Sequence, residues 1–176
     1  MRSSSLAAVL YREGASCDAL LADVARQLAG EGYRLAGAVQ TNDRYDALCA
    51  CDMTLSDLNS GRSIRISQRL GQYARGCRLD PGAMAEVVSL VEAGLAGGAD
   101  LLILNKFGKS EAAGHGFRPA IAEAVLQGIP VLVGVSAANL PAWMEFTGGE
   151  ADVLEPDAAA ILAWIGDPPP PIRASA

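Results

Sequence analysis

The sequence predicts a three-layer α/β domain, in which helices cover a mainly parallel sheet that carries an inserted β-hairpin. Three observations lead to this fold class. Apolar strand patterns alternate with amphipathic helix patterns, one stretch of strict alternation interrupts them, and 51% of the residues are hydrophobic, enough for a sizeable core. The 176 residues fit one domain over residues 1–166, followed by a proline-rich tail over 167–176.

The first elements form a strand–helix–strand unit. Leu6–Leu10 has the pattern of a short buried strand, and the helix that follows is expected to begin at Ser16, whose hydroxyl suits an N-cap, and to end at Gly30. Leu35–Val39 is the next strand. A right-handed crossover makes these two strands parallel in one sheet.

The inserted hairpin is predicted from apolar residues that alternate on both sides of a turn. Met53 and Leu55 precede the turn Asn59-Ser60-Gly61, and Ile64 and Ile66 follow it.

Helix–strand alternation then resumes to the end of the domain. The patterns predict helices over 81–97, 117–126 and 157–165, and strands over 101–104, 129–135 and 152–154, the last at an edge of the sheet. Trp143 and Phe146 are interpreted as core or interface aromatics. In such a sheet ligands bind where the parallel strands end, so we expect a site among the loops 11–16, 41–46, 105–116 and 136–139.

Charge is distributed unevenly along the chain. The net charge of −6 argues against general binding to nucleic acid or to anionic membranes. Residues 58–79, the arginine segment, carry +5 and no acidic residue, which leaves −11 for the remainder. Guanidinium groups are bidentate donors, so Arg69, Arg75 and Arg78 are candidates for holding a tetrahedral oxyanion or a phosphate. The alternative is a solvated hairpin whose arginines pair with surface carboxylates.

The loop after the first strand stands where a phosphate-binding loop would lie. Residues 11–18, YREGASCD, lack the GxxxxGK[ST] pattern and its lysine. A helix N-terminus with free N–H groups, including that of Ser16, could still hold an anion. A simple strand-to-helix turn is the alternative.

A second candidate loop follows the central strand. Lys106 and Lys109 are the two lysines of the chain, and Asn105 precedes them. An amide and an ammonium can hold an anion, but they cannot replace the carboxylates that bind Mg²⁺ or act as a base. The single histidine, His115, could donate a hydrogen bond to the same anion, although a lone histidine or a solvated lysine loop is often incidental.

The chain is expected to be cytoplasmic. Its apolar run at 6–10 is too short for a signal peptide or a membrane span, and its four cysteines form no CxxC pair, which favours reduced thiols.

Several segments resemble a known family over nearly the whole domain. Leu101–Glu111 (LLILNKFGKSE), Gly116–Arg118 and Gly128–Leu132 look like a bacterial family of unknown function, and NKFGKSE with the stretch Arg69–Pro81 is the most specific part. That family is similar to small P-loop nucleoside-triphosphatases of the thermophilic-archaeal and cancer-related type. Its members often lie beside molybdate-transport genes. The resemblance implies a P-loop-NTPase-like fold and a connection with molybdate or tungstate.

This chain departs from those triphosphatases at two places. An Asp-Glu pair stands there at the positions of Asn105 and Lys106, and a lysine-bearing loop follows the first strand. We therefore expect no catalytic residues and negligible hydrolysis of ATP or GTP.

The leading hypothesis is a non-catalytic protein that binds an oxyanion such as molybdate or tungstate. One alternative is a nucleotide-binding protein or weak nucleoside-triphosphatase that takes ATP or GTP, and another is a protein-interaction module that has lost its ligand. We expect no metal site, nucleic-acid partner or membrane insertion, and a homo-oligomer is left open. The candidate anion-binding residues are Ser16, Arg69, Arg75, Arg78, Asn105, Lys106, Lys109 and His115.

Overall fold

The computed structural model describes residues 4–12, 14–41, 53–68 and 79–166 of the chain. These residues form one seven-stranded sheet with the strand order β4-β3-β2-β5-β6-β1-β7. The strands are β1 (Leu6–Tyr11), β2 (Leu35–Thr41), β3 (Thr54–Asp57), β4 (Ser63–Arg65), β5 (Leu101–Phe107), β6 (Val131–Ser136) and β7 (Asp152–Leu154). The helices are α1 (Gly14–Gly30), α2 (Pro81–Ala96), α3 (Lys109–Ala112), α4 (Arg118–Leu126), α5 (Leu140–Phe146) and α6 (Ala158–Ile165).

The sheet is parallel except at one side. β2, β5, β6, β1 and β7 run in the same direction, whereas β3 pairs antiparallel with β2, and β4 antiparallel with β3. The predicted hairpin is therefore confirmed, and it extends the parallel sheet at one side. β7 is an edge strand, as the sequence predicts.

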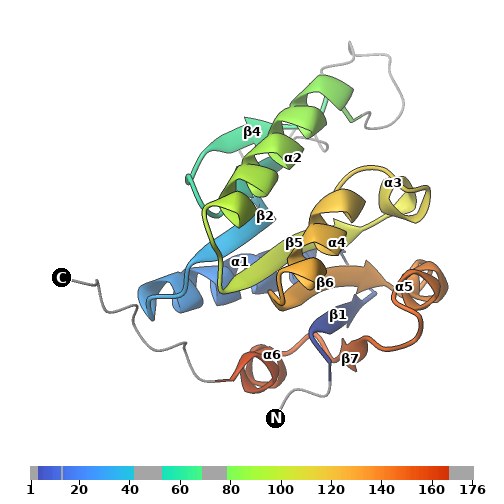
Figure 1. Ribbon diagram of the computed structural model, residues 1–176. Coiled ribbons are helices and arrows are strands. Elements are labelled where there is room, and N and C mark those ends of the chain that lie inside the picture. The colour runs from blue at the N-terminus through green and yellow to red at the C-terminus, as the bar shows by residue number, and fades with distance from the viewer. Residues whose placement is uncertain (1–3, 13, 42–52, 69–78, 167–176) are drawn as a thin grey trace.

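Helices cover both faces of the sheet and produce the three predicted layers (Figure 1). α1 and α6 pack on one face, where Leu21, Val24 and Ile161 belong to one apolar cluster. α2, α4 and α5 pack on the other face. Their contribution includes Trp143 of α5, which is fully buried and confirms that this aromatic belongs to the core. None of the helices in the described part of the chain is both long enough and apolar enough to cross a bilayer.

Two differences between predicted and observed boundaries affect the candidate site. α1 begins at Gly14 rather than after a cap at Ser16, so Ser16 lies exposed in its first turn. A hydroxyl in the sequence marks a possible cap and not the actual first residue of the helix, because the first N–H groups can be satisfied by water as well as by a side chain. β5 continues to Phe107, which pairs with Val135, so its last residues are strand rather than loop.

Two short helices were missed. α3 and α5 have four and seven residues, too few for an apolar period to be recognised. α5 also contains a proline in its first turn, where proline is tolerated because the N–H groups there have no partner within the helix.

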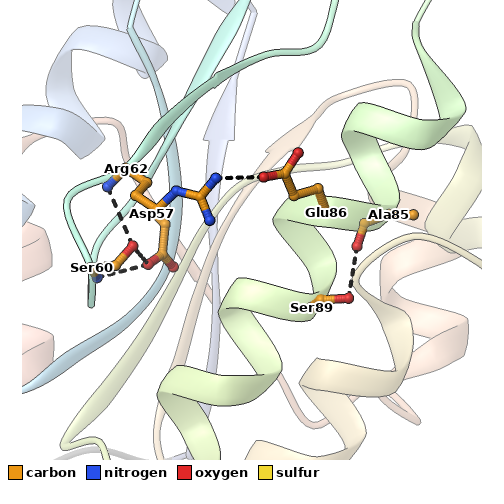
Figure 2. A network of polar contacts seen from close by, with 6 residues as sticks. All are labelled: Asp57, Ser60, Arg62, Ala85, Glu86 and Ser89. Atoms are coloured by element: carbon orange, nitrogen blue, oxygen red, sulfur yellow. Dashed lines mark hydrogen bonds and ion pairs between the residues drawn. The ribbon is translucent and has the colours of Figure 1, made fainter.

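The turn between β3 and β4 is held by a polar network at the end of the sheet where the parallel strands begin (Figure 2). Asp57 Oδ2 accepts hydrogen bonds from the backbone N of Ser60 at 2.7 Å and from its hydroxyl at 2.5 Å. The Arg62 guanidinium donates to Glu86 of α2 at 2.6 Å. The turn is thus stabilised by hydrogen bonds within it and by an ion pair with α2.

Replacing Asp57 by alanine should lower the free energy of unfolding by about 1 to 2 kcal/mol, because the turn loses two hydrogen bonds to a buried carboxylate. Asp57 Oδ1 has no partner among the described residues, which limits the net loss. Ser89→Ala is the matched control, because the exposed Ser89 hydroxyl only bonds the Ala85 carbonyl of its own helix. Urea denaturation measures both, and equal stability of the two variants would contradict this account.

Candidate functional site

The candidate site lies where the parallel strands end, here called the carboxyl end of the sheet. β1 leads there into the N-terminus of α1, and β5 leads into α3. In an open α/β sheet this is where the loops gather and ligands bind. The polar side chains at the ends of β1 and β5 therefore decide what the site can hold.

A β-bulge near the end of β5 brings two consecutive side chains together. Leu104 pairs with Val133 and Phe107 with Val135, so Asn105 and Lys106 together oppose only Gly134 of β6. Consecutive strand residues normally point to opposite faces, but a bulge redirects them. Both Asn105 and Lys106 consequently reach Asp18 of α1.

Asp18 is the centre of this arrangement, which we call the Asp18 cluster (Asp18, Asn105 and Lys106). Asp18 Oδ1 accepts a hydrogen bond from Asn105 Nδ2 at 2.7 Å and lies 3.5 Å from Lys106 Nζ. Asn105 Oδ1 in turn accepts from the backbone N of Gln40 at 2.9 Å. The cluster thus connects α1, β5 and β2.

Burial divides the cluster into an inner and an outer part. Asp18 and Asn105 are each only 3% exposed, whereas the Lys106 side chain is 37% exposed. The Asn105 amide therefore serves the interior of the fold, and Lys106 is the residue of the cluster whose side chain is partly open to solvent.

Sequence reasoning did not single out Asp18. The available signal was its helical spacing, because Asp18 stands three and seven residues before the apolar Leu21 and Ala25, on the same buried face of α1. A carboxylate on such a face needs partners, and the structure supplies them from β5.

Two further titratable groups border the cluster, and both favour their neutral forms. Burial and, to a smaller extent, the nearby Asp18 carboxylate raise the pKa of the Cys17 thiol to about 11. Burial also raises the pKa of Tyr11, with added effects of Cys17 and Asp18. Because the thiolate is the nucleophilic form of cysteine, Cys17 is a packing residue rather than a nucleophile.

The loop after β5 is folded around a second buried carboxylate. Glu111 is 5% exposed and accepts hydrogen bonds from the backbone N of Gly108 at 2.9 Å and of Phe117 at 3.2 Å. Gly116 has a φ of +60°, and a Cβ there would collide with the Glu111 carboxylate. This fold leaves Lys109 and His115 exposed.

The structure brings some of the predicted site residues together. Asn105 and Lys106 meet at Asp18, while Ser16, Lys109 and His115 are exposed, and no hydrogen bond or ion pair joins them to the cluster in the described part of the chain. Arg69, Arg75 and Arg78 lie outside the described residues. No group of three or more His, Cys, Asp or Glu side chains suited to a metal ion occurs within the described ranges.

The described residues on either side of Arg69, Arg75 and Arg78 also lie at the carboxyl end of the sheet. Thr41 at the end of β2 pairs with Thr54, and Thr54 pairs with Arg65 at the end of β4. Just beyond, Ser67 forms an antiparallel bridge with Leu79. Ser67 and Leu79, the paired residues that precede and follow the three arginines, therefore lie at the end of the sheet that carries the Asp18 cluster.

Replacing Gly134 by alanine should lower the free energy of unfolding by about 1 to 3 kcal/mol, because a Cβ there would collide with the Asn105 carbonyl oxygen and press on Cys17 Sγ. Gly30→Ala at the end of α1 is the control, since its Cβ would meet nothing within 4 Å. Urea denaturation of both variants measures the difference. If Gly134→Ala proved as stable as Gly30→Ala, the bulge in β5 would not require a glycine opposite Asn105.

Comparison with known proteins identifies the family. The α/β architecture with its mostly parallel sheet is that of a P-loop-NTPase-like domain. The chain is 41% identical over 162 residues to a protein of Bradyrhizobium diazoefficiens named molybdenum import ATP-binding protein ModC 2, a match that covers 92% of this chain and 18% of that protein. No solved structure matches significantly. Residues 6–164 match the family described as protein of unknown function (DUF2478), and the chain is a member of that family.

Proposed function

We propose that this domain binds a tetrahedral oxyanion, molybdate or tungstate, at the carboxyl end of its sheet and does not hydrolyse nucleotides. The observation that carries the proposal is the position of the residues that flank Arg69, Arg75 and Arg78 in the sequence. Ser67 and Leu79 lie at the same end of the sheet as Lys106, whose side chain is 37% exposed. This placement supports a site to which cationic donors from two distant parts of the sequence contribute in an otherwise acidic domain.

Chain length allows this convergence. β4 and β5 are three strand spacings apart in the sheet, roughly 14 Å. A loop closed between Ser67 and Leu79 can reach at most roughly 20 Å from its base. Arg75, four residues from Leu79, is therefore within range of the end of β5, where Lys106 and Lys109 supply further positive charge. Arg69 and Arg78 stand only two residues and one residue from the base of the loop, so their reach toward β5 is shorter.

Arg62, at the other end of the sheet, already has an acidic partner. It belongs to the same arginine segment, but it lies at the opposite end of the sheet and is paired with Glu86. The Arg62–Glu86 ion pair connects the hairpin to α2. Under this proposal, the arginines that follow Ser67 in the sequence instead donate hydrogen bonds to the oxyanion.

The named relative supports the class of ligand. Its name connects it with molybdenum import and with ATP binding. The chain spans only 18% of that protein, so the name describes a much longer molecule. Molybdate is an oxyanion of molybdenum, and it fits a site made of guanidinium and ammonium groups. Each of these groups can donate more than one hydrogen bond to the oxygens of an anion.

A nucleotide is the second candidate ligand. The P-loop-NTPase-like fold and the ATP-binding relative favour it. The residues oppose hydrolysis, because no lysine follows β1 and the buried Asn105 amide cannot act as a carboxylate base or metal ligand. An interaction module without any ligand is the third outcome that the following experiment separates.

A thermal-shift screen with molybdate, tungstate, sulfate, phosphate, ATP and GTP tests the proposal, because a ligand that prefers the folded state raises the melting temperature. Molybdate or tungstate should give the largest shift. Arg75→Ala and Arg78→Ala should weaken oxyanion binding by about tenfold or more, since each charge-assisted bond contributes about 1.5 to 3 kcal/mol.

Arg62→Ala is the matched control, an arginine of the same segment at the opposite end of the sheet, and it should leave oxyanion affinity unchanged. A shift with ATP or GTP alone would favour the nucleotide-binding alternative. The absence of any shift, or unchanged affinity in Arg75→Ala and Arg78→Ala, would contradict the proposal and favour the interaction module.

A further inference from the structure

The Asp18 cluster carries no net charge of its own. Lys106 Nζ lies 3.5 Å from Asp18 Oδ1, and Asn105 is neutral. The charge of the carboxylate therefore partly cancels that of the ammonium for any ligand that contacts Lys106. A tetrahedral dianion bound at Lys106 needs further positive charge from outside the cluster.

Arg12 differs from the other arginines in the described part of the chain. It follows β1 directly at the carboxyl end of the sheet, and its side chain is exposed. The others each have a protein partner: Arg26 pairs with Asp23, Arg34 with Asp100, Arg62 with Glu86, Arg65 with Ser67 and Arg118 with the Glu111 carbonyl. No hydrogen bond or ion pair joins the Arg12 side chain to a residue of the described ranges. Within these ranges, its charge is not offset by a partner.

Arg12 is near enough to the cluster for one anion to contact both Arg12 and Lys106. Asp18 stands one helical turn after Gly14, the first residue of α1, and Arg12 stands two residues before Gly14. The Cα atoms of Arg12 and Asp18 are therefore at most roughly 13 Å apart. An arginine side chain covers about half of this distance, and an oxyanion with a hydrogen bond of about 2.9 Å on each side spans the remainder.

The strand between β1 and β5 ends in small side chains. This strand is β6, and residues 136–138 at its end are Ser-Ala-Ala. None of the three is acidic or bulky, so they do not repel an anion that lies between Arg12 and Lys106. Ser136 Oγ accepts the backbone N–H of Asn139 at 3.3 Å, which leaves its own O–H as a donor.

We propose that Arg12 is a further donor of the oxyanion site, and that the bound anion lies between the ends of β1 and β5 with Arg12 on one side and Lys106 on the other. The inference deepens the proposed function and rests on it for the identity of the ligand. The Arg12 guanidinium supplies a charge and a pair of parallel N–H donors. Asp18 is a positioning residue, because it holds the Lys106 ammonium on the other side of the anion.

Arg12→Ala should weaken tungstate binding to the full chain about tenfold or more, because it removes a charge-assisted contact. Isothermal titration calorimetry measures the affinity. Arg26→Ala is the matched control, an exposed arginine of α1 that pairs with Asp23, and its affinity should agree with that of the parent within about twofold. A parent that binds tungstate no better than Arg12→Ala does would overturn the inference and leave the proposed function standing. A parent that binds no oxyanion would overturn both.

A second measurement needs no variant and remains decisive if Arg12→Ala does not fold. Phenylglyoxal modifies exposed arginines, and mass spectrometry of peptides follows the rate at each position. With tungstate at ten times its Kd, modification of Arg12 should slow about tenfold, because about nine-tenths of the chains hold the anion. Modification of Arg26 should keep its rate. An unchanged rate at Arg12 in protein that calorimetry shows to be occupied would overturn the inference.

Discussion

The burial of one carboxylate imposes the constraint on which the candidate site depends. An ionised group taken out of water costs several kcal/mol unless charge and hydrogen bonds compensate it, and Asp18 is almost fully buried. Compensation comes from Asn105 and Lys106, which can both reach Asp18 because β5 bulges opposite Gly134. One local irregularity of a strand therefore fixes the position of α1, satisfies its carboxylate and places a lysine at the surface where the parallel strands end.

The two ends of the sheet carry different kinds of ion pair. At the end where the parallel strands begin, Arg34 donates to Asp100 at 2.6 Å, and this hydrogen bond lowers the pKa of the Asp100 carboxyl. Arg62 and Glu86 form a similar pair at the adjoining hairpin turn. At the opposite end the Lys106 ammonium is shared between a buried carboxylate and solvent. At one end, ion pairs between surface side chains join neighbouring elements. At the other end, Lys106 pairs with a buried carboxylate and its side chain stays partly exposed.

The sequence was sufficient for the architecture but only partly for the site. Strands such as 101–104 and the hairpin about Asn59-Ser60-Gly61 could be predicted because apolar periodicity is local. The extension of β5, the bulge and the role of Asp18 could not, since each depends on residues far apart in the chain that meet only after the strands have paired. Asn105 and Lys106 were recognised as candidates from their residue types, whereas their shared partner in α1 required the fold. The roles of Arg69, Arg75 and Arg78 stay predictions.

The most direct test of the account is the position of a bound oxyanion. Tungstate scatters anomalously, so a crystal of the protein soaked with tungstate shows the tungsten atom as a peak in an anomalous difference map. The account predicts a peak at the carboxyl end of the sheet, in contact with the Lys106 ammonium and with guanidinium groups of the arginine segment. A peak only at the opposite end, beside pairs such as Arg34 and Asp100, or no peak in a protein that binds tungstate in solution, would contradict it.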